Sequence, residues 1–210
     1  MNIVEALNWR YAAKRMNGRK VPHEKVERIL EAARLAPSSY GLQTYSILVI
    51  EDPALREKIR VLAYDQPQIT ESSHLLVFAA WENINETHVD DFIRMTAAAR
   101  GLKLTELEGY RQAINGTVNG FASSDEQLHW AARQAYISLG TALTAAATEQ
   151  VDASPMEGFD AAGLDDLLSL REQGLRSVVL LALGYRDTGS DRQAGMTKVR
   201  WPRERMFIHL

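Results

Sequence analysis

The sequence predicts one domain that contains both helices and buried strands. Three runs are rich in β-branched and apolar residues, as is typical of strands: Tyr45–Glu51, His74–Trp81 and Val178–Leu183. Between them lie segments whose apolar residues recur every three or four positions, the spacing of one helix face. The 210 residues contain no repeat, low-complexity tract or linker, so we expect a single domain over residues 1–210.

Composition excludes several kinds of chemistry. The chain has no cysteine, which excludes disulfides, thiolate nucleophiles and cysteine metal ligands. The formal net charge of −3 provides no overall positive field for nucleic acid or membrane. No apolar run approaches the roughly 20 residues that span a bilayer, and residues 1–10 lack the pattern of a signal peptide. We therefore expect a cytoplasmic protein.

Helical patterns flank the first strand. Residues 2–9 predict a short helix. Pro22 opens a second helix with an apolar face, and Pro37 stops it. A third helix is predicted from Asp52-Pro53 to about Ala63.

Two further helices are predicted after the second strand. Residues Asn85–Arg100 carry apolar residues at helical spacing, and Gly101 ends that helix. A more polar helix contains Leu107 and Ile114, and a glycine-bearing loop follows at Gly116–Gly120.

The longest apolar pattern starts after Ser123, which can form a capping box with Glu126, and continues to about Glu149. This helix is apolar almost all round, which indicates burial on all sides. A dimer interface achieves such burial more easily than a lone domain of this size. A short helix at Asp160–Ser169 and a short final strand at Arg205–Leu210 complete the prediction.

The tetrapeptide Pro155-Met156-Glu157-Gly158 lies between the long helix and the last buried strand. Proline fixes φ at one end, and glycine at the other permits unusual conformations and close approach of a ligand. Such a turn can direct backbone N–H groups at a flat, electron-rich ligand. Taken alone, a Pro-x-x-Gly sequence is usually only a turn.

Charged and hydroxyl side chains give two further candidate sites. Lys198 and Arg200 are two residues apart in an extended segment, so they point the same way and suit a phosphate. Arg10 and Lys14 lie at the other end of the chain, and the alternative is two unrelated surface patches. The loop Ser38–Gly41 could meet a phosphate or a ring edge, or simply end a helix.

Common catalytic motifs are missing. The five histidines are scattered without His-Glu-x-x-His spacing, and we expect no metal site. Gly-x-Ser-x-Gly, Walker and Gly-x-Gly-x-x-Gly motifs are also absent. An enzyme with this sequence would need a cofactor that brings its own reactivity.

Five motifs in order carry a resemblance that covers nearly the whole chain. They are Arg10-Tyr11-x-x-Lys14, Ala36-Pro37-Ser38-Ser39 with Gln43, Asp65-Gln66-x-Gln68 with Ser72-Ser73-His74, Pro155–Asp160, and Lys198-x-Arg200-x-Pro202. Together they resemble the FMN-dependent nitroreductase family, in its bacterial NAD(P)H-dependent branch.

The resemblance implies an α+β nitroreductase-like fold, with a mostly antiparallel central sheet flanked by helices. It also implies an intertwined homodimer in which the C-terminal segment of each chain crosses to the partner. One FMN would lie in each of two pockets at the interface, with NADH or NADPH as co-substrate.

The same resemblance implies roles for particular residues. Arg10, Lys198 and Arg200 would hold the phosphate and ribityl chain, beside Tyr11 and Ala12. Lys14 would reach the pyrimidine side of the ring, where Gln66 and Gln68 would also lie. Pro37, Ser38 and Ser39 would come from the other subunit. In the turn of Pro155 and Met156, Glu157 and Gly158 would present N–H groups to flavin N5, which makes Glu157 and Lys14 the expected catalytic residues.

The implied reaction is a ping-pong oxidoreduction, in which a hydride passes from NAD(P)H through flavin N5 to a nitroaromatic, quinone or related small acceptor. The same scaffold also serves reductive dehalogenation and flavin fragmentation. A flavin-binding or storage module without turnover, and a helical scaffold protein, are alternatives from other classes. Small-molecule acceptors are the expected ligands, with no nucleic acid or membrane.

Overall fold

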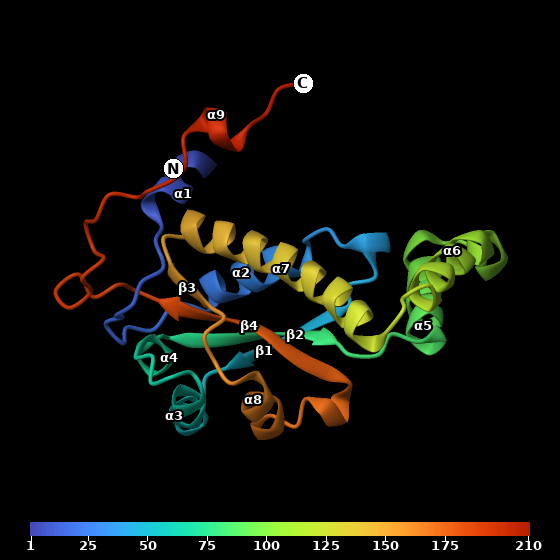
Figure 1. Ribbon diagram of the computed structural model, residues 1–210, viewed down its shortest axis with the longest axis horizontal. Helices are drawn as coiled ribbons and strands as arrows, with labels where there is room; N and C mark the ends of the chain where they lie inside the picture. Colours follow the sequence, from blue (N-terminus) through green and yellow to red (C-terminus); the bar gives the residue numbers. More distant parts are fainter.

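The computed structural model describes residues 1–210 and has a four-stranded sheet at its centre (Figure 1). The strands are β1 (Tyr45–Ile50), β2 (His74–Trp81), β3 (Asp152–Met156) and β4 (Leu175–Gly184). Their order is β1-β2-β4-β3, and every neighbouring pair is antiparallel. The predicted antiparallel α+β architecture is therefore confirmed.

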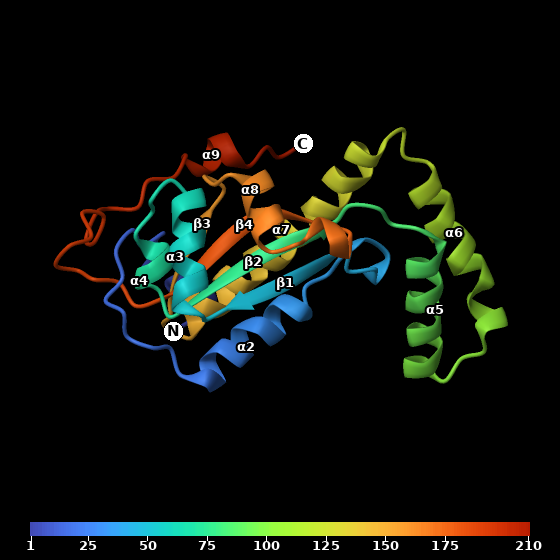
Figure 2. The same ribbon diagram turned by 90° about the horizontal axis from the view of Figure 1, so that it is seen from below.

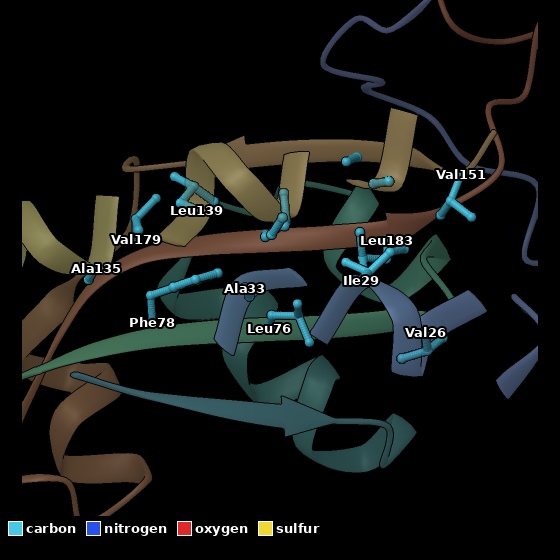
Figure 3. Packing of buried hydrophobic residues seen from close by; sticks show 14 of the residues in the cluster. Val26, Ile29, Ala33, Leu76, Phe78, Ala135, Leu139, Val151, Val179 and Leu183 are labelled. Carbon is cyan, nitrogen blue, oxygen red and sulfur yellow. The ribbon is translucent and has the colours of Figure 1, made fainter. Parts of the chain in front are cut away.

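Helices cover both faces of the sheet. Helices α2 (His23–Arg34) and α7 (Ser124–Thr148) pack on one face, and α3 (Pro53–Leu62), α4 (Gln68–Glu71) and α8 (Ala161–Leu167) pack on the other. Side chains of a strand alternate between the faces. Accordingly Leu76 and Phe78 of β2 join the cluster under α2 and α7 (Figure 3), whereas Leu75 and Val77 join the opposite cluster.

A pair of helices projects from one end of the sheet (Figure 2). Helix α5 (Glu86–Arg100) begins at the Asn85 cap and ends at Gly101, whose φ of 66° is the left-handed conformation that glycine favours. A 3₁₀ turn at Leu104–Leu107 leads into α6 (Glu108–Asn119). The pair shares an apolar cluster with Ala80 of β2 and Ala131 of α7.

The ends of the chain form short helices. Helix α1 (Ile3–Trp9) contacts α7, and α9 (Arg203–Met206) lies in an otherwise irregular C-terminal segment. Two further 3₁₀ turns occur at Ser39–Gly41 and Arg171–Gln173. No helix combines the length and the apolar character needed to cross a membrane.

Three local predictions are wrong, each for a physical reason. The predicted loop at Gly116–Gly120 is helical through Asn119, because Ile114 and Val118 bury the same face of α6. The predicted strand at Arg205–Leu210 is instead α9 followed by unpaired chain. The capping box is displaced: Ser123 accepts from Glu126 N–H, but the Glu126 carboxylate accepts from Ala122 N–H at 2.7 Å.

The turn predicted at Pro155–Gly158 is only half correct. Pro155 and Met156 end strand β3, which the sequence does not reveal because it is polar and contains proline. β3 is an edge strand, so the missing N–H of Pro155 is tolerated in the ladder. Gly158 does not adopt a positive φ, so conformational freedom is not the reason for glycine there.

Candidate functional site

A cationic cavity of about 530 Å³ lies where the two ends of the chain meet. Residues 8–12, Arg186 and residues of the segment 193–200 line it. Arg10, Lys198 and Arg200 therefore share one cavity, and the alternative of two unrelated patches is wrong. Tyr11 and Ala12 also line this cavity.

The cations of this cavity are close enough to repel one another. Burial lowers the pKa of Arg10, and Arg200 lowers it further. The pKa of Lys198 is lowered by burial and then by Arg10, Arg200 and Arg186. The buried Nε of Arg10 has no hydrogen-bond partner. Such crowding of positive charge, with an unpaired buried donor, favours an anionic ligand.

Arg186 is a fourth cation in this cavity, and its role differs from the others. Its guanidinium lies 4.3 Å from the ring centre of Trp9 and 4.5 Å from that of Tyr11. Its Nε donates to the buried carboxylate of Asp152 at 2.7 Å. Arg186 is thus neutralised inside the protein and fixes the walls of the cavity.

A second, polar cavity of about 480 Å³ adjoins the first. Its lining residues are Lys14, Arg15, the segment 66–68 and residues 190–193. Gln193 lines both cavities, so the two form one groove. The ammonium group of Lys14 makes no hydrogen bond or ion pair and can meet a ligand.

Asp191 joins the two sides of the groove and was missed by sequence reasoning. It is only 4% exposed. Its carboxylate accepts from the Tyr11 hydroxyl at 2.9 Å, from Lys14 N–H at 2.8 Å and from Gln193 N–H at 2.9 Å. Burial alone would raise the pKa of Asp191, but these hydrogen bonds outweigh it and lower that pKa below its usual value.

The Glu157 turn, residues Glu157 and Gly158, follows β3 beside the polar cavity. Gln66 Nε2 donates to the Gly158 carbonyl oxygen at 2.8 Å. The backbone N–H groups of Glu157 and Gly158 donate to no protein atom. The turn is therefore held by its carbonyl while two donors remain free for a ligand.

Gln68 holds the side chain of Gln66 in place. It is 1% exposed, and its Nε2 donates to Gln66 Oε1 at 3.0 Å. The same nitrogen lies 3.2 Å from Met156 Sδ. Burial and these bonds favour a positioning role for Gln68, while direct contact of Gln66 with a ligand stays a prediction.

The loop Pro37–Ser39 lines neither cavity. Ser39 N–H donates to Gln134 Oε1 at 2.9 Å, and Ser38 Oγ accepts from Gln43 N–H at 3.0 Å. Within one chain the loop is thus apart from the other predicted residues. Its contact with a partner's site stays a prediction.

Comparison with known proteins identifies the family. The family model described as "Nitroreductase family" matches residues 7–185. The chain belongs to the nitroreductase family. This nitroreductase-family chain is 30% identical over 196 residues to a Staphylococcus saprophyticus protein named "Putative NAD(P)H nitroreductase", covering 89% of each chain. A Staphylococcus haemolyticus protein of the same name is 31% identical and covers 96% of this chain and 94% of its own.

Solved structures of nitroreductases share the fold. A Bacillus subtilis protein described as a putative nitroreductase superposes with a TM-score of 0.86 at 22% identity, covering 99% of this chain and 98% of its own. Another, from Exiguobacterium sibiricum and described as a putative nitroreductase in complex with FMN, has a TM-score of 0.82 at 21% identity. The match covers 100% of this chain and 98% of that one. At these identities the likeness shows the fold alone.

Proposed function

We propose that this chain is an FMN-dependent oxidoreductase that uses NADH or NADPH to reduce small acceptors such as nitroaromatics and quinones. The observation that carries the proposal is the groove itself. Crowded cations lie at one end, at Arg10, Lys198 and Arg200, and two free backbone N–H groups lie toward the other. A flat cofactor with a phosphate tail matches both ends.

Each part of the groove has a task in this proposal. The three cations bind the phosphate, and Lys14 offsets negative charge on the pyrimidine side of the ring. The N–H groups of Glu157 and Gly158 orient the reactive edge. FMN held here would supply the two-electron chemistry that links NAD(P)H to the acceptor. No protein nucleophile or metal is needed for this reaction.

Names of relatives support the same proposal. The staphylococcal relatives are named for NAD(P)H nitroreduction, and one solved structure with this fold contains FMN. Both substrates would use one site, so steady-state kinetics test the proposal. Double-reciprocal plots at varied NADPH and several quinone concentrations should be parallel. Intersecting lines would show that both substrates bind together and would contradict the ping-pong order.

We further propose that the working protein is a homodimer with exchanged C-terminal segments. The tail exposes Trp201, Phe207, Ile208 and Leu210. Strand β1 is an edge of the sheet, and beside it lies a mainly apolar cavity of about 710 Å³ that includes Ile47 and Val49. An exposed apolar tail and an open apolar strand edge are complementary surfaces, so the partner's tail is the occupant that we propose for this cavity.

The dimer can be tested at the tail. Ile208→Asp should convert the protein to monomers in light scattering coupled to gel filtration, because a carboxylate would be buried in the cavity. Val61→Asp is the matched control, since Val61 is 76% exposed on α3 and does not line this cavity. A dimer that survives Ile208→Asp would contradict exchange.

A further inference from the structure

Tyr136 makes a contact with the Glu157 turn that the proposed function does not use. Tyr136 lies on α7, and its hydroxyl donates to Glu157 Oε1 at 2.6 Å. The same hydroxyl oxygen is 3.3 Å from the carbonyl oxygen of Val178 in β4. The phenol has one proton, which the shorter contact takes, so the carboxylate of Glu157 is tied to α7.

The backbone N–H and the side-chain carboxylate of Glu157 have different surroundings. The backbone N–H of Glu157 is free, whereas its carboxylate is held by Tyr136. No cation pairs with this carboxylate within 4.0 Å, because Glu157 takes part in none of the chain's ion pairs. The hydroxyl of Tyr136 is thus its only hydrogen-bond donor from another side chain.

The protonation state of Tyr136 suits this task. Burial raises the pKa of Tyr136, and the hydrogen bond to Glu157 raises it further. The phenol therefore stays protonated and donates at every pH at which the protein would work.

We propose that Tyr136 is a positioning residue that holds the Glu157 carboxylate away from the redox cofactor, so that the N–H groups of the turn face it instead. The inference rests on the proposed function. A free carboxylate at the reactive edge would oppose the arrival of electrons, because negative charge near the ring disfavours its reduced form. Tyr136 thus sets the electron affinity of the bound cofactor without contacting it.

The test compares Tyr136→Phe in two backgrounds. In the native background the freed carboxylate can swing toward the ring, so the midpoint potential of bound FMN should become more negative. In the Glu157→Gln background no charge is released, so adding Tyr136→Phe should leave the potential unchanged. Spectroelectrochemical titration of the flavin-loaded proteins measures both potentials, and FMN content should remain that of the native protein.

A matched control is Tyr185→Phe. Tyr185 follows β4, and its hydroxyl makes no hydrogen bond; its ring instead lies under Arg19 at 3.9 Å. This variant should keep the native midpoint potential.

A second measurement is the rate constant for reduction by NADPH. It should fall about tenfold in Tyr136→Phe alone, the effect expected of one lost hydrogen bond to a charged group.

The outcomes separate this inference from the function on which it rests. A native potential in Tyr136→Phe overturns the inference, and so does an equal shift in the Glu157→Gln background, which would indicate a general loosening of the turn. If the native protein takes up no FMN, the proposed function itself is wrong.

Discussion

The cationic cavity and the Glu157 turn are the two ends of one groove, and they are built in opposite ways. The turn lies at the end of a sheet strand, and its Gly158 carbonyl is fixed by Gln66, which in turn is fixed by the buried Gln68. The cavity is formed by the end of α1 and by irregular segments from both chain ends, and its Lys198 and Arg200 lie outside any helix or strand.

The difference shows which end depends on a ligand. The turn has its bonds within the chain and presents donors that are already oriented. In the cavity, burial and neighbouring cations lower the pKa of Arg10 and of Lys198. The Lys198 ammonium donates to the backbone carbonyls of Leu7 and Arg10 and to no carboxylate, whereas Arg186 pairs with Asp152. We infer that the turn is preformed, whereas phosphate binding completes the cavity.

The largest expected effect is at the cavity. Replacing Lys198 and Arg200 together with Ala should remove most bound FMN, because each hydrogen bond from a cation to the phosphate is worth about a tenfold to hundredfold change in affinity. The dimer should survive. Fluorescence titration with FMN measures the affinity, and gel filtration measures the dimer.

The matched control for that variant is Arg203→Ala with Arg205→Ala. It removes the same charge from the same segment, but these side chains lie against Phe207 and Trp201 rather than in the cavity. Equal loss of FMN in both double variants would show that only overall charge matters, and the cavity would lose its assigned role.

Asp191→Asn tests the hydrogen bonds that connect Tyr11 of the cationic cavity with Lys14 of the polar cavity. The variant replaces a charged acceptor of three donors with an amide that presents its own N–H, so we expect the free energy of unfolding to fall by about 1–3 kcal/mol and FMN affinity to fall with it. Urea unfolding measures the free energy of unfolding, and titration with FMN measures the affinity. Asp187→Asn, in the same loop, changes a half-buried carboxylate that accepts only from Gly189 N–H and the Ser190 hydroxyl, and it should change both quantities less.

The support of the turn is tested by Gln66→Ala. This change removes the donor to the Gly158 carbonyl, so the free N–H groups should lose their fixed direction. We expect FMN to stay bound and the rate of reduction by NADPH to fall about tenfold, the scale of one lost hydrogen bond. Stopped-flow absorbance measures that rate. If the variant instead loses FMN and keeps its rate of reduction, Gln66 contributes to FMN binding and not to the orientation of the turn.

The smallest expected effect is that of Glu157→Gln. If Glu157 acts through its backbone N–H, the amide side chain keeps the acceptor for Tyr136 and most activity survives. Steady-state turnover with NADPH and a quinone should remain within about threefold of native, less than the change that losing one hydrogen bond produces. A loss of a hundredfold would show that the carboxylate itself takes part.

Much of the fold could be predicted from the sequence because the largest signals are local. Strands β2 and β4 are nearly continuous apolar runs, and α2 repeats its apolar residues at helical spacing. Strand β3 has neither signal. Its five residues include Asp152, Ser154 and Pro155, and only pairing with β4 makes them a strand.

The candidate site was predicted in its cations and its turn but not in the residues that fix them. Asp191 sits in a polar loop of surface composition, and its partner Tyr11 is 180 residues away in the sequence. Arg186 is one arginine among many until Trp9, Tyr11 and Asp152 surround it. Such residues gain their roles from tertiary contacts, which no local pattern encodes.

The most direct test is the visible spectrum of the purified protein, recorded without oxygen before and after NADPH. We predict flavin absorbance that bleaches on addition of NADPH and returns on addition of a quinone. A yellow protein that neither NADH nor NADPH bleaches would indicate flavin binding without turnover. A colourless protein that takes up no added FMN would contradict the proposed FMN-dependent function.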